Sequence, residues 1–219
     1  EVNRLAETGT KEVVLTGIHI GDYGRDLDYY KDHQSKDDPI VDLMERFFAI
    51  PNIRVRISSL EPSEASEALL DVLFANKERV CDHFHLPLQS GSDHILKLMG
   101  REYDKAEYSD AVHRIRLRFP EAHIGADIIP GFPGETDEHA KETIVFIESL
   151  ALSSLHVFPY SKRPNTRALR MPDHVDGNII KSRASSLRNL SDDLHKKYMR
   201  KFIGKNLTVI WEKDFDKSN

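Results

Sequence analysis

The stretch "HFHLPLQSGSDHILKLMGR", residues 83–101, decides the fold. Every second residue from Phe84 to Leu88 is apolar, which is typical of a buried strand. The polar triplet Gln-Ser-Gly follows at 89–91, and a helix-like apolar pattern begins almost at once. In parallel α/β folds, ligands bind beyond the carboxyl ends of the strands. The triplet therefore predicts a binding site at the tip of this strand.

The same strand-then-helix pattern repeats along the chain. It predicts strands over 12–17, 53–58, 83–88, 123–129 and 153–160. It predicts helices over 39–49, 64–74, 104–119, 136–150 and 178–203. Strands separated by helices favour parallel pairing, because each return needs a crossover. The expected class is α/β, arranged as a barrel or an open sheet.

Local signals place the ends of several elements. We expect Ser63 to cap the second helix, Asp104 and Glu107 to form a capping box, and Thr136 to cap the fourth helix. Gly204 is the expected stop of the last helix. The polar stretch 26–38 reads as a long surface loop. The stretch "LTVIWEK" at 207–213 reads as the first strand of a further element.

Composition limits the class of protein. The chain has 219 residues, of which 39% are hydrophobic and 31% charged, a balance typical of globular proteins. No apolar run approaches the roughly 20 residues that a membrane span needs. The single cysteine, Cys81, excludes an internal disulfide and any multi-cysteine metal site within these residues. Cys81 precedes a strand and is interpreted as a small buried side chain.

The net charge of −5 is unevenly distributed. Residues 181–205 contain eight basic and two acidic side chains, so this segment carries +6 and the rest of the chain −11. A basic helix on an acidic body marks a nucleic-acid contact or, in the simpler interpretation, a solvated helix face.

The strand tips carry polar side chains that turn formation alone does not require. Glu61, Gln89 and Asp127 follow or end three different strands, and a carboxylate or amide there suits a ribose diol or an ammonium group. Structural alternatives stay open: Asp127 pairs with an arginine, or Glu61 bonds a loop. Four histidines at the strands show no metal-ligand spacing, so no metal site is expected; they are His19, His83, His85 and His156.

Five segments together resemble the methylthiotransferases of the radical S-adenosylmethionine (SAM) superfamily. They are "EVVLTGIHIGDYG", "RISSLEPSE", "HLPLQSGSDHILKLMGR", "GADIIPGFPGET" and "LHVFPYSKRPNTRA". The order and spacing agree from residue 1 to about 213. "LTGIHIGDYG" and "SSLEP" favour the branch that acts on threonylcarbamoyladenosine in tRNA over the isopentenyladenosine and ribosomal-protein branches.

The resemblance implies a partial (β/α) TIM-type barrel, with an open parallel sheet of five strands in chain order and helices outside. It implies SAM and two 4Fe-4S clusters as cofactors. It also implies tRNA and an electron-donating reductant as partners, no membrane, and a cytoplasmic location. The family's CxxxCxxC motif, which holds the radical-generating cluster, is absent from these residues. The chain is therefore expected to be inactive alone, with a radical-SAM core over 1–204 and the start of a C-terminal TRAM domain over 205–219.

The resemblance also implies roles for individual residues. Cofactor contacts are expected from the strand tips: Thr16, Gly17, His19, Glu61, Gln89, Asp127 and Phe158. Phe158 is assigned to stacking on adenine, and no residue of the chain is assigned a catalytic role. RNA contacts, mainly to phosphates, are expected from Arg101, Arg163, Arg183, Lys196, Lys197, Arg200 and Lys201.

Two interpretations from other classes compete with this one. The first is a catalytically silent RNA-binding module that works through the basic helix. The second is an ordinary phosphate-binding TIM-barrel enzyme, complete as it stands. The first differs from the methylthiotransferase in lacking SAM binding at the strand tips.

Overall fold

A computed structural model describes residues 1–24 and 38–210 of the chain. The predicted polar loop lies almost entirely outside the described residues. In chain order, the elements are α1 (Val2–Glu7), β1 (Glu12–Leu15), η1 (Ile20–Asp22), α3 (Pro39–Phe48), β2 (Arg54–Ile57), η2 (Pro62–Glu64), α4 (Glu67–Ala75), η3 (Lys77–Arg79), β3 (His83–His85), α5 (Asp93–Met99), α6 (Lys105–Arg118), β4 (His123–Ile128), α7 (Asp137–Ser149), β5 (Ser154–Val157), η4 (Ala168–Arg170) and α8 (Gly177–Arg200).

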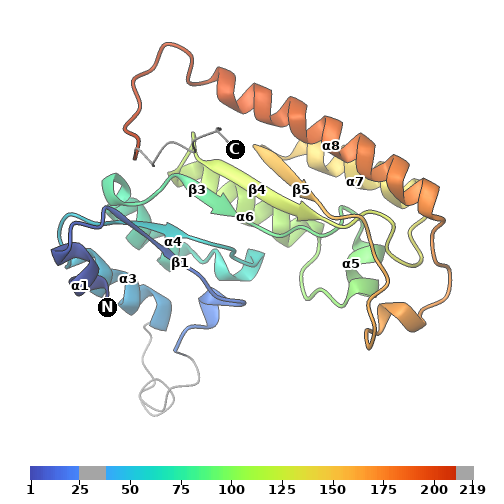
Figure 1. The fold of residues 1–219 in the computed structure, drawn as a ribbon, viewed down its shortest axis with the longest axis horizontal. Helices are drawn as coiled ribbons and strands as arrows, with labels where there is room; N and C mark the ends of the chain where they lie inside the picture. Colours follow the sequence, from blue (N-terminus) through green and yellow to red (C-terminus); the bar gives the residue numbers. More distant parts are fainter. Residues whose placement is uncertain (25–37, 211–219) are drawn as a thin grey trace, which may run out of the picture.

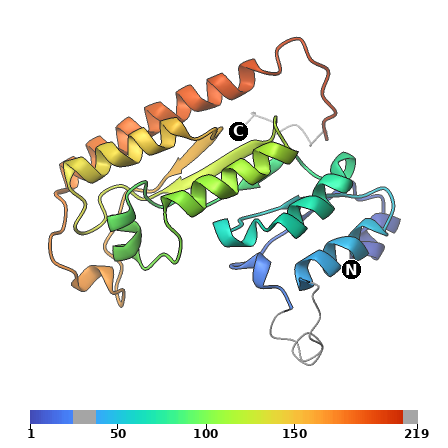
Figure 2. The ribbon, with the colours of Figure 1, turned by 180° about the vertical axis from the view of Figure 1, so that it is seen from behind.

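All strand pairs are parallel and follow chain order, as expected for this α/β class. β1 pairs with β2, and β3 pairs with β4, which pairs with β5. Figure 1 shows the strands facing the viewer, with α4 and α6 behind them. The view from behind in Figure 2 brings those helices to the front. The described residues form no closed barrel, so they do not match a complete TIM-barrel enzyme.

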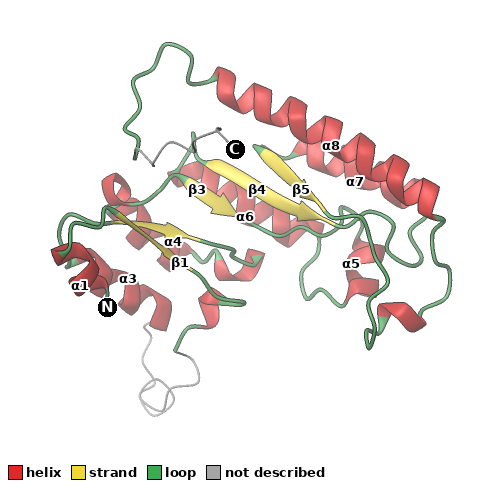
Figure 3. Cartoon of the chain, viewed as in Figure 1, coloured by secondary structure: helices red, strands yellow, loops and turns green. Residues whose placement is uncertain are grey.

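The predicted continuous five-stranded arc is divided into ladders of two and three strands, which Figure 3 shows as two groups of arrows. Single bridges join β2 to the next segment at Val55–Val80 and at Ser59–His85. These bridges enclose one residue more on the β3 side than on the β2 side. The extra residue is taken up in a tight turn, where the His83 N–H donates to the Cys81 carbonyl at 2.6 Å. The ladder is interrupted there, although the strands remain neighbours.

Each strand buries alternate residues under the helices. Val55, Phe84, Ile124 and Leu155 are at most 6% exposed and face this core. Tyr108 of α6 is fully buried there, and its hydroxyl donates to the Leu86 carbonyl at 2.9 Å. The other face of the strands carries the polar side chains of the alternation. The core therefore lies on one side of the sheet, and the opposite side is left for polar chemistry.

Most predicted caps are confirmed. Asp104 and Glu107 form a reciprocal capping box, and Thr136 caps α7 in the same way. Ser63 as a cap is wrong: it lies within η2, and Ser66 accepts the Leu69 N–H at the start of α4. Pro62 occupies the first position of η2 and starts a separate short turn there, so α4 begins only after Ser66.

The C-terminal helix α8 ends at Arg200, and Gly204 follows with a left-handed φ of +80°. α8 lies along the outer edge of β5, as Figure 1 shows. Its Ser191 hydroxyl donates to the Leu155 carbonyl at 3.0 Å and accepts the Leu155 N–H at 2.9 Å. The helix thereby satisfies an edge position of the sheet. Residues 207–210 of the predicted final strand are not in a strand, and the remainder lies outside the described part.

Two histidines on the polar face make stability depend on pH. The rings of His83 and His123 stack with centroids 4.7 Å apart. Burial, reinforced by the positive charge of Arg56, lowers the pKa of each ring to about 4 from 6.5. The folded state therefore disfavours protonation, whereas the unfolded chain protonates near pH 6.5.

We expect the free energy of unfolding contributed by this pair to be fully present above pH 6.5 and to be lost as the pH falls toward 4. Urea unfolding of the protein between pH 4 and 8 measures this. A His83→Gln, His123→Gln variant should lose stability less steeply over that range. An equal slope in the variant and the natural protein would contradict the assignment.

Candidate functional site: the strand tips and the polar face

A polar pocket of about 480 Å³ opens at the tips of β1 and β2. It is lined by His19, Asp22, Glu61, Ser63, Glu64, Gly100, Arg101 and Glu102. The structure thus brings together two of the predicted cofactor residues, His19 and Glu61. Four of the lining residues are acidic, which suits a cationic ligand group.

Glu64 forms part of the wall of this pocket. Its side chain is 7% exposed and accepts the Glu61 N–H at 2.8 Å, while its other oxygen faces His19 Nδ1 at 3.8 Å. Gly21 packs directly on it, since a Cβ at position 21 would lie 2.5 Å from Glu64 Cγ. Burial raises the pKa of Glu64. The glycine of the "HIGDYG" segment is therefore needed for the close approach of the two strand tips.

Arg101 enters the pocket opposite Glu61, with Nη1 at 3.3 Å from Glu61 Oε1. Glu61 also forms a capping box with Glu64 at the start of η2, so the loop contact considered for Glu61 is present beside this ion pair. Arg101 Nε is buried and has no hydrogen-bond partner among the described residues. An unsatisfied donor at a pocket wall is a place for a ligand acceptor. Arg101 was predicted to contact RNA; in the structure it lines this pocket.

The Gln-Ser-Gly tip is rigidly placed. Gln89 has a left-handed φ of +68° and is buried, and its backbone bonds both Asp127 and Ile129 of the neighbouring strand segment. A non-glycine residue in this region is uncommon and is retained where the surroundings determine it. The Gly91 N–H donates to Thr143 Oγ1 at 3.0 Å, and a Cβ at Gly91 would lie 2.7 Å from Thr143 Cα. The tip is therefore held against α7.

Gln89 belongs to a different pocket from Glu61. With Ser90 it lines a cavity of about 90 Å³ between the strand tips, α7 and α8. The predicted rim residues therefore do not form one cluster in the structure.

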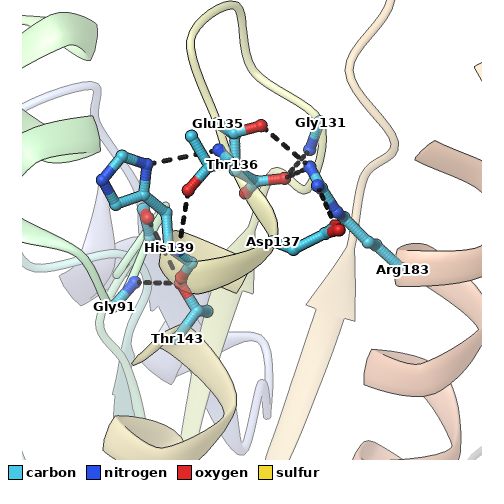
Figure 4. A network of polar contacts seen from close by, with 9 residues as sticks. Gly91, Gly131, Glu135, Thr136, Asp137, His139, Thr143 and Arg183 are labelled. Carbon is cyan, nitrogen blue, oxygen red and sulfur yellow. Dashed lines mark hydrogen bonds and ion pairs between the residues drawn. The ribbon is translucent and has the colours of Figure 1, made fainter. Parts of the chain in front are cut away.

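A buried ion pair closes the far side of that cavity, and Figure 4 shows its network. Glu135 Oε2 accepts from the Gly131 N–H and from Arg183 Nη1, each at 2.7 Å. Arg183 Nη2 donates to Asp137 at 2.7 Å. Burial raises the pKa of Glu135, and hydrogen bonds from Gly131 and Arg183 oppose that rise. Arg183 was predicted to contact RNA, but its side chain is 12% exposed and joins α8 to the tip of β4.

Asp127 lies between two histidines on the polar face, not beside an arginine. Its Oδ1 is 2.9 Å from His85 Nε2 and 3.3 Å from His156 Nδ1. We call His85, Asp127 and His156 the imidazole cluster. Their ligand atoms lie within 4.8 Å of one another, a separation that also suits a metal ion, as do those of His19, Asp22 and Glu64. Spacing along the chain did not reveal these sets, because each is assembled across neighbouring strands or turns.

The remaining predicted residues are at the surface. Thr16, Gly17 and His19 are exposed at the tip of β1. Phe158, a residue 53% exposed, follows β5 on the polar face, two residues beyond His156. Arg163, Lys196, Lys197, Arg200 and Lys201 are exposed on the loop after β5 and along the last turns of α8 and its end. Lys196 lies 3.5 Å from Asp193, and Lys201 lies over the Tyr198 ring.

Comparison with known proteins identifies the family. The model of the radical SAM superfamily matches residues 1–147. The chain belongs to the radical SAM superfamily. Among solved structures, coproporphyrinogen III oxidase (HemN) of Escherichia coli aligns with a TM-score of 0.52 at 19% identity, over 76% of this chain and 36% of that one. The Elp3 protein of Methanocaldococcus infernus aligns with a TM-score of 0.52 at 15% identity, over 91% and 57%. These likenesses confirm the radical SAM fold.

Sequence relatives are more specific. The chain is 39% identical over 215 residues to the threonylcarbamoyladenosine tRNA methylthiotransferase MtaB of Bacillus subtilis (strain 168), covering 98% of this chain and 46% of that protein. It is 37% identical over 220 residues to the tRNA-2-methylthio-N(6)-dimethylallyladenosine synthase of Pelotomaculum thermopropionicum, covering 100% and 47%. The chain thus spans about half the length of the curated relatives it matches.

The radical SAM family implies a 4Fe-4S cluster, and these residues do not fit one. Such clusters are held by several cysteine thiolates, and the chain has one cysteine. Cys81 is buried and lies 2.9 Å from Glu12 Oε2. Burial, followed by the hydrogen bond to Glu12, raises the pKa of Cys81 to about 12. The thiol stays protonated at neutral pH, which excludes it as a nucleophile or thiolate ligand.

We expect Cys81 to resist alkylation in the folded protein. At pH 8, iodoacetamide should label it on the order of 100-fold or more slowly than in denaturing urea, because the thiolate is the reactive form. Glu12→Gln removes one cause of the raised pKa and should accelerate labelling without unfolding. Equal labelling rates in the folded and unfolded protein would contradict this account; mass spectrometry of timed samples measures them.

Proposed function

We propose that the chain is the central part of a tRNA-modifying methylthiotransferase. The enzyme adds a methylthio group to C2 of N6-threonylcarbamoyladenosine next to the anticodon, in the cytoplasm. The observation that carries the proposal is the match of nearly the whole chain, at 37–39% identity, to methylthiotransferases named for tRNA adenosines. Residues 1–204 would be the radical-SAM core, and 205–219 would begin a TRAM domain.

The polar pocket has the donor and acceptor set that SAM requires. SAM carries an ammonium and a sulfonium, for which Glu61 and Glu64 supply negative charge, and a carboxylate, for which the unsatisfied Arg101 Nε is a donor. Thr16, Gly17 and His19 would complete the contacts at the β1 tip. We assign Gln89 and Asp127 to holding neighbouring parts of the site, and the exposed Phe158 ring to stacking on adenine.

When bound, SAM and the iron–sulfur centres supply the methyl-transfer and radical chemistry. We propose two 4Fe-4S clusters in the full-length enzyme, held by cysteines outside these residues and reduced by an electron donor. The residues of this chain then bind and orient SAM and exclude water from it. No helix of the described chain is long and apolar enough to cross a membrane.

Membership of the threonylcarbamoyladenosine branch is the finer part of the proposal. The relatives named above belong to two branches, which act on adenosines with a polar or a hydrocarbon N6 substituent. The polar face of β3, β4 and β5 carries histidines and an aspartate, not a hydrocarbon-lined surface. This favours the polar substituent.

The function is tested on the full-length enzyme with reconstituted clusters. Nucleosides from treated tRNA, analysed by mass spectrometry, should show the methylthio product of threonylcarbamoyladenosine. Glu61→Gln should weaken SAM binding about 10-fold in calorimetry, because a charge-assisted bond is lost. Glu45→Gln, on the exposed surface of α3, is the matched control. RNA binding with no SAM binding would instead identify a catalytically silent RNA-binding module.

The tRNA surface is proposed to include the C-terminal turns of α8. Lys197, Arg200 and Lys201 are exposed, and Lys196 has only a 3.5 Å contact with Asp193. Tyr198 packs edge-on against His123 and is half-buried, so it is not free to stack on bases. Contacts from this surface should therefore be with phosphates.

Replacing Lys196, Lys197, Arg200 and Lys201 by Gln should weaken tRNA binding by the full-length enzyme. It should also flatten the dependence of log K on log salt, by about one unit or less for each lost contact. Filter binding across a salt series measures both. Lys77, Lys97 and Lys141, on other elements, supply a control triple variant. If the affinity and the salt slope are unchanged in the α8 variant, the interpretation that remains is a solvated helix face.

A further inference from the structure

The imidazole cluster lies where three strands present side chains to one face. Asp127 and His156 are register partners on β4 and β5, and His85 is paired with Gly125, two residues from Asp127. All three therefore project from the same side of the sheet, toward its carboxyl ends. This is the side opposite α4 and α6, the open side in Figure 1.

Asp127 fixes both imidazole rings and leaves one nitrogen of each unused. His85 engages Asp127 through Nε2, and His156 engages it through Nδ1. The rings stack with centroids 5.0 Å apart. The two nitrogens of an imidazole lie on opposite sides of the ring, so His156 Nε2 points away from Asp127. The His156 side chain is 59% exposed, whereas that of His85 is 13% exposed. His156 is therefore the member that a ligand reaches.

The surroundings favour an anionic ligand group. Arg56 projects from the same face of β2, because its neighbours Val55 and Ile57 are buried on the helix side. Arg56 has no ion-pair partner among the described residues. Its positive charge acts on His83 and His123, which form the adjacent part of the face. Because His83 and His123 stay neutral at pH 7, the charges of this face are the positive charge of Arg56 and the negative charge of Asp127, which two imidazoles share.

We propose that the imidazole cluster is the subsite for an anionic N6 substituent of the target adenosine, with His156 as the residue that contacts it. The inference rests on the proposed function and adds how the substrate is selected. A threonylcarbamoyl group carries a carboxylate, a hydroxyl and a urea carbonyl, whereas a dimethylallyl group is a hydrocarbon. The His156 ring lies between Asp127 and the incoming carboxylate, with Nδ1 facing Asp127 and Nε2 facing the ligand. A hydrocarbon there would desolvate the polar groups without replacing their hydrogen bonds.

The test compares two anticodon stem-loop RNAs of one sequence on the full-length, cluster-reconstituted enzyme. One RNA carries N6-threonylcarbamoyladenosine, and the other carries its methyl ester, which removes the negative charge and adds one methyl group. The natural enzyme should methylthiolate the free acid with a kcat/KM on the order of 10- to 100-fold higher, the effect of one charge-assisted hydrogen bond. His156→Phe should lose this preference by slowing only the reaction of the free acid. His156→Gln, which keeps a neutral hydrogen-bonding side chain, should retain part of it.

His113→Phe, at an exposed position on α6, is the matched control and should retain the full preference. Thermal unfolding should be unchanged in the His156 variants. If both His156 variants keep the preference for the free acid, or lose activity equally on both RNAs, the inference is overturned. A preference that chelation abolishes and Zn²⁺ restores would also overturn it, since a metal would then do the binding. If the natural enzyme modifies neither RNA, the proposed function itself fails, which is a separate result.

Discussion

The structure depends on a one-sided core. Helices pack against one face of the parallel strands, so each strand must place apolar residues at every second position, and the intervening residues face the other way. On the helix side Phe84 packs against Phe119 and the Leu86 carbonyl accepts from Tyr108, while His83 and His85 project to the opposite side. The polar face is therefore not an addition to the fold. It is the other half of the pattern that builds the core, and its residues can vary without disturbing the packing of the helices.

The alternation of apolar and polar residues ends at the strand tips, so other contacts determine the shape of the site there. Beyond each strand the chain is held by local contacts: Gly91 against Thr143, Gly21 against Glu64, and Gly131 against Glu135. Gly91 and Gly21 pack closely against residues that are distant in the chain, whereas Gly131 donates its N–H to Glu135 within the same loop. These contacts fix the position of loops that have no ladder hydrogen bonds. A SAM-sized ligand thus meets a surface whose shape is set before it binds, which reduces the entropy lost on binding.

Sequence patterns predicted the strands, their parallel order and most helix caps, because these depend on residues close together in the chain. Ser63 was misjudged as a cap, since a proline-initiated turn separated it from α4. The interruption between β2 and β3 was not foreseen either, because one extra residue near Cys81 leaves no compositional signal. Glu61 was singled out at a strand tip and lines the polar pocket, but its partner Arg101 is 40 residues away along the chain. The imidazole cluster and the Glu135–Arg183 pair arise only when strands and helices are placed side by side.

The hydrogen bonds between Ser191 and Leu155 determine the edge at which a further strand can join the sheet. Leu155 offers both its N–H and its carbonyl to one hydroxyl of α8, so an added strand at that edge would have to displace a helix. At the other edge, β1 pairs only with β2 among the described residues, and its outer backbone groups are not used by a strand. Any further strand, from the same polypeptide or another, is therefore directed to β1. The β5 edge of the sheet is therefore covered by α8, and the β1 edge is open to strand pairing. With one edge covered, copies of the molecule cannot add to one another repeatedly through both edges, although the sheet does not close into a barrel.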